Sequence, residues 1–244
     1  MVRRSTTASG LEDAGLHHVG AQELCAGRYR LDARNADASL KMSILDPMPE
    51  LVRKATVAEL DALAAILGHA FFDDPVMTWL MPVVGHRRAR LGPFFARIIE
   101  GIHLRHDLVY AAGAGAGCAV WDPPESWRVG LLAQARVAPS MVALFGGRTL
   151  RLLSLLSALE KQHLHEPHYY LFAIGTDPGH QGRGIGSSLL APMLARCDAE
   201  KKPAYLESSN RRNLPFYARH GFETIGTIDL ESGPSLTRMR RSPR

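Results

Sequence analysis

Residues 168–222 decide the fold of this chain and read HYYLFAIGTDPGHQGRGIGSSLLAPMLARCDAEKKPAYLESSNRRNLPFYARHGF. The apolar segment 169–176 predicts a strand, and the periodic apolar pattern after the glycine-rich turn predicts a helix. A second apolar segment and a short helix with Phe216-Tyr217 follow. This order of strand, turn, helix, strand and helix predicts an α/β protein with backbone N–H groups gathered at a helix start.

The glycine-rich turn has the composition of a phosphate site. Gly182 and Gly184 remove side chains where an anion must approach the backbone, and the helix dipole favours negative charge there. A nucleoside-triphosphate loop needs Lys where Ile185 stands, so that class is excluded. A dinucleotide-binding fingerprint fits better, with Ser187 in place of the third small residue and Glu207 ending the next strand. A helix-capping loop without a ligand is the third interpretation.

The full constellation resembles the GCN5-related N-acetyltransferase (GNAT) superfamily. The Gln-x-x-Gly-x-Gly turn of that family falls here on Gln181, Gly184 and Gly186, and the resemblance implies that it holds the pyrophosphate of acetyl-CoA. Asn210 stands where the family commonly contacts the pantetheine arm. Tyr217 stands where the family has its usual proton donor to the departing thiolate.

A closer resemblance, to the puromycin-type N-acetyltransferases, covers roughly residues 51–239. It includes Asp74-Pro75, Leu206-Glu207 and the segment 212–217. This resemblance implies an α/β (α+β) GNAT fold: a central mixed, mostly antiparallel sheet flanked by helices and splayed at the acetyl-CoA site. It also implies a helical insert before the fourth strand and an aminoacyl or antibiotic amine as acceptor.

In the superfamily the cofactor arm pairs with the strand before the glycine turn like an added β-strand. The resemblance therefore implies backbone contacts along that strand and around the turn. The expected acetyl-CoA contacts are Ala173, Ile174, Gly175, Thr176, Gln181, Gly182, Arg183, Gly184, Ile185, Gly186, Ser187 and Asn210.

The formation of an amide bond from a thioester and an amine indicates which other groups the active site needs. An amine attacking a thioester generates an oxyanion, which needs a backbone N–H, and a thiolate, which Tyr217 can protonate. The incoming alkylamine is an ammonium with a pKa near ~10, so a base or a water relay must remove its proton. We expect Glu207 to be this base, with Glu166 and His168 as the other candidates.

Two acidic positions have competing interpretations. Glu207 could instead form a salt bridge with Arg211 or Arg212. Asp73 and Asp74 could attract a cationic acceptor, but Asp-Asp-Pro also predicts a solvated turn, which is the interpretation we favour.

Composition is consistent with one enzyme domain. The 244 residues are 46% hydrophobic, enough for a full core, and no stretch approaches the ~18 uninterrupted apolar residues of a membrane span. The net charge of +5 comes without a basic stripe interleaved with aromatic residues, so nucleic acid is not expected. Three scattered cysteines and no apolar run behind the N-terminal arginines predict a cytoplasmic protein with reduced thiols.

The chain divides into a flexible extension, residues 1–47, and an acetyltransferase domain, residues 48–244. Within the domain, residues 123–167 form the predicted helical insert, broken near Pro139 and Gly146-Gly147. Its expected apolar face is Leu150, Leu153, Leu156 (or Leu152) and Leu159. Packing over the sheet is the interpretation we favour for this insert, and a wall of the acceptor pocket is the other.

Three further features bear on the chemistry or the fold: a histidine-rich segment, a cysteine and a proline inside a helix. His163, His165, His168 and Glu166 share no helical face, so no metal site is expected. Cys197 follows the apolar periodicity of its helix and is predicted to be a core residue rather than a nucleophile. Pro192 lies inside the same helix and predicts a kink or a local irregularity.

The sequence therefore predicts an acetyl-CoA-dependent N-acetyltransferase acting on a primary amine of a small molecule, as a monomer or homodimer. A protein or peptide N-acetyltransferase is the alternative within enzymes. A non-catalytic acyl-CoA-binding sensor and a dinucleotide-binding protein are alternatives of other classes.

Overall fold

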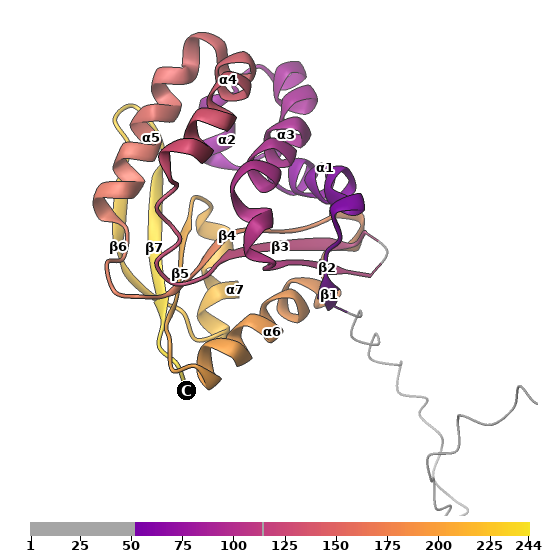
Figure 1. Cartoon of the computed structure of the whole chain (residues 1–244), viewed down its shortest axis with the longest axis vertical. Coiled ribbons are helices and arrows are strands. Elements are labelled where there is room, and N and C mark those ends of the chain that lie inside the picture. The colour runs from indigo at the N-terminus through magenta and orange to yellow at the C-terminus, as the bar shows by residue number, and fades with distance from the viewer. Residues whose placement is uncertain (1–51, 114) are drawn as a thin grey trace, which may run out of the picture. The chain divides into compact units, whose positions relative to one another are not determined.

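The computed structural model describes residues 52–113 and 115–244. The predicted extension, residues 1–47, lies outside the described part of the chain. The described residues form a mixed sheet with helices on both of its faces (Figure 1).

The sheet has seven strands in the order β1-β2-β3-β4-β5-β7-β6. The strands are β1 (Val52–Lys54), β2 (Val109–Ala112), β3 (Gly117–Asp122), β4 (Tyr169–Thr176), β5 (Ala204–Ser208), β6 (Glu223–Asp229) and β7 (Ser235–Arg241). The α-helices are α1 (Leu60–Ala70), α2 (Pro75–Leu80), α3 (Val84–Ile98), α4 (Leu131–Phe145), α5 (Thr149–Gln162), α6 (Ile185–Ala199) and α7 (Leu214–Arg219).

The sheet opens between its two central strands. Every neighbouring pair is antiparallel except β4 and β5, which are parallel and pair only at Tyr169 with Ala204 and at Tyr170 with Tyr205. Beyond that point β4 continues to Thr176 paired with β3. In Figure 1, β2–β4 run across the view while β5–β7 run up it. The predicted mixed, mostly antiparallel and splayed sheet is confirmed.

Two hydrophobic clusters, one on each face of the sheet, hold the helices in place. The first includes Leu67 of α1 and Phe95 of α3, and the second includes Leu189 and Met193 of α6. All four side chains are at most 1% exposed. Because burying such a side chain contributes about 1.5–3 kcal/mol, these contacts fix α1 and α6 against the strands that border the opening.

Helix α6 follows the predicted apolar periodicity. Cys197 is fully buried in its core face, and burial raises the pKa of this thiol to about 12, which confirms the predicted core role. The α-helix runs without interruption through Pro192. Proline removes only the hydrogen bond to the Ser188 carbonyl, and the buried residues on either side keep the helix continuous.

The predicted insert contains α4 and α5, which are joined by a 3₁₀ turn, η4 (Gly146–Arg148). Gly146 has φ 55°, a left-handed conformation that favours glycine, so the predicted break at this place is confirmed. The predicted break at Pro139 is wrong, because α4 is continuous there. Pro139 and Ala135 are exposed, so water can solvate the Ala135 carbonyl that loses its hydrogen bond.

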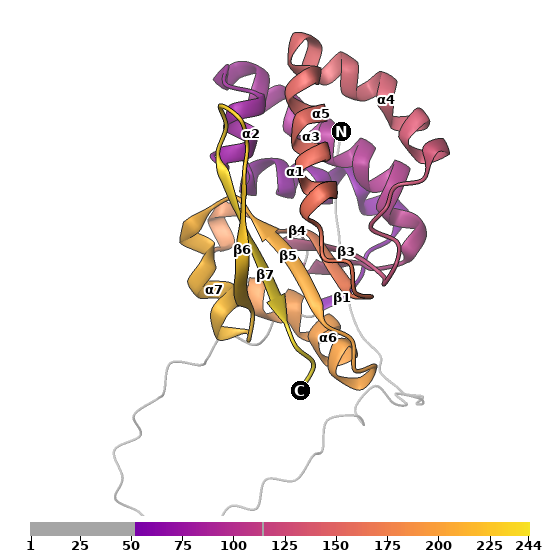
Figure 2. The same cartoon turned by 90° about the vertical axis from the view of Figure 1, so that its left-hand side faces the viewer.

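The predicted apolar face of α5 is confirmed only in part: Leu152, the alternative to Leu156, is buried, and Leu159 packs partly buried against the first cluster. Leu150, Leu153 and Leu156 are 77%, 54% and 50% exposed, whereas Leu152 and Leu155 are buried. Helix α5 lies at the rim of the fold, where it contacts α4 and β6, and only this narrow stripe is covered (Figure 2). Neither helix of the insert packs over the centre of the sheet.

By length and composition, the helical stretch Leu131–Gln162 is the one candidate membrane span in the described part of the chain, and 17% of its most apolar window is buried. Arg148 and Arg151 interrupt it near its middle, and Arg151 donates to the Trp79 carbonyl of α2 at 3.1 Å. This contact ties the stretch to the rest of the domain. The absence of a membrane partner stays a prediction.

Strand β1 forms one edge of the sheet and carries charged side chains. Arg53 pairs with Glu59, and Lys54 pairs with Asp107. Charges of this kind discourage another strand from adding to the edge.

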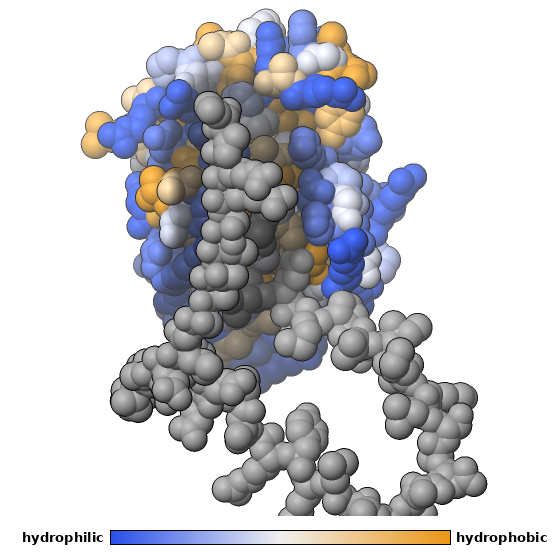
Figure 3. Space-filling model, turned by 90° about the vertical axis from the view of Figure 1, so that its right-hand side faces the viewer, coloured by the Kyte–Doolittle hydropathy of each residue, from blue (hydrophilic) through white to orange (hydrophobic). Residues whose placement is uncertain are grey.

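Outside the grey atoms, the face shown in Figure 3 is mainly hydrophilic, with smaller hydrophobic patches.

Candidate active site

The splay of β4 from β5 leaves one edge of β4, from Leu171 to Thr176, without a paired strand among the described residues. A cavity lies at this opening. Its lining is Phe71, Asp74, Leu171, Phe172, Ala173, Ile174, Leu206, Glu207, Ser208, Ser209, Asn213 and Tyr217. An extended ligand could therefore pair with the backbone of β4 and reach the polar groups of the cavity.

Asp74 enters the cavity from the start of α2. Its carboxylate is the N-cap of that helix and accepts hydrogen bonds from the backbone N–H groups of Val76, at 2.9 Å, and Met77, at 3.1 Å. Ser209 of the opposite wall also donates to it. Burial raises the pKa of Asp74, and these hydrogen bonds act in the opposite direction.

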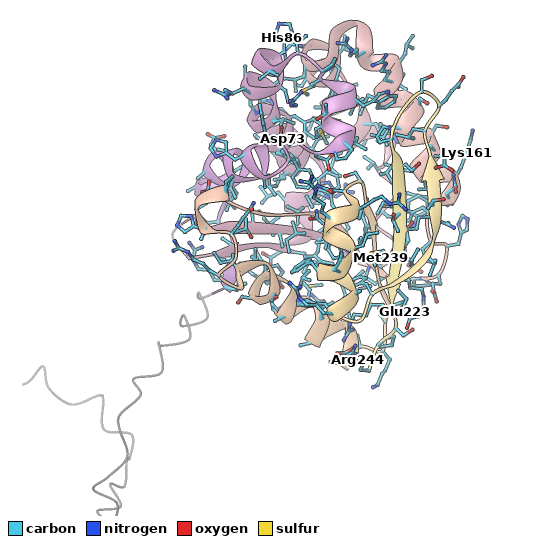
Figure 4. All side chains as sticks on the ribbon, turned by 180° about the vertical axis from the view of Figure 1, so that it is seen from behind. Asp73, His86, Lys161, Glu223, Met239 and Arg244 are labelled. Atoms are coloured by element: carbon cyan, nitrogen blue, oxygen red, sulfur yellow. The ribbon has the colours of Figure 1, made fainter. Side chains whose placement is uncertain are left out.

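The predicted solvated turn is therefore wrong for Asp74 and holds for its neighbour. Asp73, labelled in Figure 4, has a side chain 89% exposed. Asp74 with Pro75 at the first helical position is a standard helix start, which turns the Asp74 side chain back over α2 and into the fold. The acidic group that faces the cavity is Asp74.

Tyr217, the predicted proton donor, lies on α7 and lines the cavity. It is 7% exposed, and burial, followed by the nearby Asp74 carboxylate, raises the pKa of its hydroxyl above the ordinary value for tyrosine. The hydroxyl consequently stays protonated at neutral pH. It can donate a proton to a strongly basic group that forms in the cavity, as a thiolate would be.

Glu207, the predicted base, lies on β5 and lines the cavity from the side opposite α1. Its side chain is 2% exposed, and Oε1 lies 3.2 Å from Nδ1 of His163. Oε2 is buried and has no hydrogen-bond partner among the described residues. The alternative of a salt bridge to Arg211 or Arg212 is wrong, because the carboxyl group turns inward to His163.

The other base candidates are placed differently. His168 is 1% exposed and contacts His163, so it reaches Glu207 only through that imidazole. The side chain of Glu166 points outward and pairs with Arg240 at 2.5 Å. His165 is exposed. Within the described ranges, no group of three or more His, Cys, Asp or Glu residues could hold a metal ion.

The glycine turn has the geometry of an anion site. Gly182 and Gly184 both have φ 80°, and a side chain at either position would point into open space. Gly184 is the N-cap of α6, and no side chain caps the first turn of this 15-residue helix. Its free N–H groups and the exposed Arg183 can meet a pyrophosphate.

Two other glycines of the predicted cofactor set are required by packing. A Cβ at Gly175 would lie 2.8 Å from Cβ of Ala70, so α1 can approach β4 only over a glycine. A Cβ at Gly186 would lie 3.1 Å from the ring of Phe216. Their predicted contacts with acetyl-CoA would be made through the backbone.

The remaining residues of the predicted cofactor set surround the same opening. Ala173 and Ile174 line the cavity. The Thr176 carbonyl accepts a hydrogen bond from the side chain of Gln181 at 3.3 Å, which ties the turn to the end of β4. Ile185 is 2% exposed in the core, so only its backbone is available to a ligand.

Ser187 and Asn210 already have partners in the described structure. The Ser187 hydroxyl lies 3.0 Å from Nε2 of His220. Oδ1 of Asn210 accepts from the backbone N–H of Arg212 at 3.0 Å, and the cavity is lined instead by Asn213. The predicted contact of Asn210 with the pantetheine arm would therefore use its side-chain N–H₂ or its backbone.

The sequence did not identify several cavity residues: Phe71, Phe172, Ser208, Ser209 and Asn213. Phe172 and the two serines carry no motif and meet only through the tertiary fold. One of the two interpretations of the insert is that it forms a wall of the acceptor pocket. No residue of α4 or α5 is among the lining residues.

Comparison with known proteins agrees with this geometry. The family model described as "Acetyltransferase (GNAT) family" matches residues 116–222. An uncharacterized N-acetyltransferase of Schizosaccharomyces pombe (strain 972) is 30% identical over 170 aligned residues, and the match covers 65% of this chain and 68% of that protein.

Solved structures show the same fold. A Corynebacterium glutamicum structure described as histone acetyltransferase HPA2 and related acetyltransferase has a TM-score of 0.63 at 27% identity, covering 81% of this chain and 98% of that chain. Arylalkylamine N-acetyltransferase 2 from Aedes aegypti has a TM-score of 0.55 at 12% identity, covering 80% and 99%. The second likeness concerns the fold alone.

Proposed function

This chain belongs to the GNAT family of acetyltransferases, and we propose that it moves the acetyl group of acetyl-CoA directly to the primary amine of a small molecule. We propose an acceptor of puromycin type, with an aminoacyl or antibiotic amine. The cavity supports this proposal, because the carboxyl groups of Asp74 and Glu207 and the hydroxyl of Tyr217 line one space at the open edge of β4.

The Asp74 carboxylate favours a cationic acceptor. An ammonium about 4 Å from a carboxylate gains roughly 4 kcal/mol at the effective dielectric constant of ~20 that is typical near a protein surface. Asp74 is held in place by two backbone N–H groups and by Ser209, so it can attract the acceptor without moving. Glu207 lies on the opposite side of the opening with one oxygen unpartnered.

The reaction assigns one task to each part of the site. The edge of β4 would hold the pantetheine arm and offer a backbone N–H to the oxyanion, and the turn with Gly182 and Gly184 would hold the pyrophosphate. Glu207 would take the proton of the ammonium. The amine nitrogen then bonds to the thioester carbon, the carbon–sulfur bond breaks, and Tyr217 would protonate the departing thiolate.

Direct transfer is favoured over a covalent acetyl-enzyme. Among the described residues, the free cysteines are Cys118 and Cys197, and both are fully buried. Burial raises the pKa of each thiol to about 12, so neither is a thiolate at neutral pH. A thiol without its thiolate is a poor nucleophile.

Release of free CoA thiol from acetyl-CoA, measured across a panel of amines, tests the proposal. The panel contains puromycin, an alkyl polyamine, an arylalkylamine and a peptide with a free N-terminus. Fast release with a small amine supports the proposal. Release with the peptide alone would favour the protein or peptide acetyltransferase, and acetyl-CoA binding without release with any amine would favour the sensor.

A further inference from the structure

A chain of buried polar groups continues from the cavity into the protein. Oε1 of Glu207 lies 3.2 Å from Nδ1 of His163, Nε2 of His163 lies 3.1 Å from Nε2 of His168, and Nδ1 of His168 lies 2.7 Å from the backbone carbonyl oxygen of Glu166. The Glu207 and His163 side chains are 2% and 4% exposed. The chain therefore begins at the predicted base and ends at a group that can only accept a hydrogen bond.

These contacts determine where the protons lie. The Glu166 carbonyl accepts, so Nδ1 of His168 carries a proton, and the neutral imidazole then has its lone pair on Nε2. His163 must donate to that lone pair from its own Nε2. Neutral His163 is then left with a lone pair on Nδ1 that faces the oxygen of Glu207.

One more proton is required between Glu207 and His163. It resides either on the carboxyl group, as a neutral acid, or on the imidazole, as an ion pair. In both cases Glu207, His163 and His168 together have a net charge of zero rather than −1. A buried ion pair is costly, so the neutral acid is favoured in the empty cavity.

The groups packed around His163 do not compete for this proton. Tyr170 of β4 and Tyr205 of β5 lie edge to face with His163. Burial, followed by the nearby carboxyl group of Glu207, raises the pKa of both hydroxyls above the ordinary range. Burial also lowers the pKa of His168, which keeps that imidazole neutral.

The remaining neighbours of His163 and Glu207 are either uncharged or keep their charge at neutral pH. Trp127 stacks on the His163 ring at 4.1 Å. Arg238 of β7 is the cross-strand partner of Glu207 and donates to the Gln162 carbonyl at 2.6 Å. Within this buried group, the proton between Glu207 and His163 is therefore the one that can move.

We propose that His163, held in the required tautomer by His168, stores the proton that leaves the acceptor amine, a role that rests on the proposed acetyl transfer. The N–H bond of the ammonium breaks and an O–H bond forms at Oε2 of Glu207. At the same time the O–H bond at Oε1 breaks and an N–H bond forms at Nδ1 of His163. The ammonium proton thus becomes an imidazolium proton, and Glu207 remains a neutral acid.

His163 and His168 touch neither the amine nor acetyl-CoA in this scheme. They are positioning residues that act through Glu207.

The test compares two acceptors on one skeleton: the best alkylamine found in the panel and its aminooxy analogue, whose nitrogen is unprotonated at neutral pH. His163→Asn keeps an amide near Nδ1 but cannot store a proton. We expect kcat for the alkylamine to fall about a hundredfold, as removal of acid–base help does, and kcat for the aminooxy analogue to change less than threefold. His165→Asn, an exposed histidine nearby, is the matched control and should behave as wild type on both acceptors.

Each outcome has one meaning. Equal losses on both acceptors would overturn the proton-storage role while leaving acetyl transfer intact, and so would full activity of His163→Asn on the alkylamine. If wild type acetylates neither acceptor, the proposed function itself fails. Acetyl-CoA affinity, measured in parallel, shows whether a variant is folded.

A measurement on wild type keeps the inference testable if His163→Asn does not fold. Nitrogen chemical shifts of ¹⁵N-labelled histidine distinguish the two tautomers. We expect His168 as the neutral Nδ1–H tautomer and His163 with a proton on Nε2. A proton on Nε2 of His168, with Nδ1 bare, would overturn the proposal, because the chain of donors would then run in the opposite direction.

Discussion

Helices α6 and α5 have nearly the same length, 15 and 14 residues, but are held very differently. Helix α6 buries five residues, among them Leu189 and Met193, against the sheet beside the cavity. Helix α5 buries only Leu152 and Leu155 and exposes Leu150 at the rim of the fold. The helix that begins at the glycine turn is therefore fixed in position, whereas the helix of the insert is held by a narrow contact.

The difference has a functional consequence. A phosphate site made of backbone N–H groups works only if the helix start does not move, and the core of α6 supplies that rigidity. The insert contributes no residue to the cavity lining. We expect substitutions near the start of α6 to affect cofactor binding and stability, and equivalent changes in the insert to affect neither.

The largest effect is expected from Gly184→Asp at the start of α6. The residue has φ 80°, and an aspartate there adds both strain and a negative charge facing the pyrophosphate. Acetyl-CoA affinity should fall by on the order of 10³-fold, measured by calorimetry. Gly147→Asp, at the junction of α4 and α5 in open space, is the matched control and should bind normally. Wild-type affinity of Gly184→Asp would show that the pyrophosphate binds elsewhere.

Leu189→Ala should give the next largest effect. Leu189 is fully buried, and truncating such a side chain costs about 3 kcal/mol through lost contacts and a cavity. Chemical denaturation should show this loss of unfolding free energy. A cost below about 1 kcal/mol would mean that α6 is not held by its core face.

Tyr217→Phe removes the proposed acid while keeping the ring. We expect kcat to fall about thirtyfold to a hundredfold with acetyl-CoA affinity unchanged, because the hydroxyl acts on the departing thiolate. Steady-state kinetics separates the two quantities. Tyr110→Phe, a tyrosine of β2 that contacts Met193 rather than the cavity, is the control. Unchanged turnover of Tyr217→Phe would remove this residue from the mechanism.

The end of α6 should make stability depend on pH. Asp198 accepts two hydrogen bonds from Arg241, both 2.8 Å long, and these lower the pKa of the carboxyl group to about 2. Because the folded pKa lies below the unfolded value of ~3.9, the stabilisation is present above pH ~4 and is lost as the pH falls towards 2. Asp198→Asn should flatten the dependence of the melting temperature on pH in that window. An unchanged slope would contradict the assignment.

The smallest effect is expected in the insert. Leu153→Ala removes a side chain that is 54% exposed, so the unfolding free energy should change by less than about 0.5 kcal/mol. Chemical denaturation of Leu153→Ala and Leu189→Ala under the same conditions compares their losses of unfolding free energy. A loss as large as that of Leu189→Ala would show that the exposed face of α5 is covered in solution.

Local patterns predicted the cofactor half of the fold well. The strand at residues 169–176, the glycine turn and α6 all appear where the periodicity and the glycines place them. Each of these signals depends on neighbouring residues along the chain. The break at Gly146 was predicted for the same reason, since a left-handed backbone conformation is a local requirement.

The errors concern contacts between distant segments. Which face of α5 is buried depends on where α4 and β6 lie, so the leucine pattern alone also placed the exposed Leu150, Leu153 and Leu156 on the buried face. The burial of the Asp74 carboxylate involves Ser209, which donates to it from 135 positions away and which no local pattern could reveal. The role of Pro139 depends on whether Ala135 faces water.

By itself, the sequence determined the acetyltransferase fold, the turn with Gly182 and Gly184, and the candidate roles of Tyr217 and Glu207, because motif spacing and periodicity are local properties. Only the tertiary structure decided that Asp74 faces the same cavity and that His163 lies against Glu207. Those groups come from separate elements, and their protonation depends on which donors and acceptors the fold brings within 3.2 Å of one another.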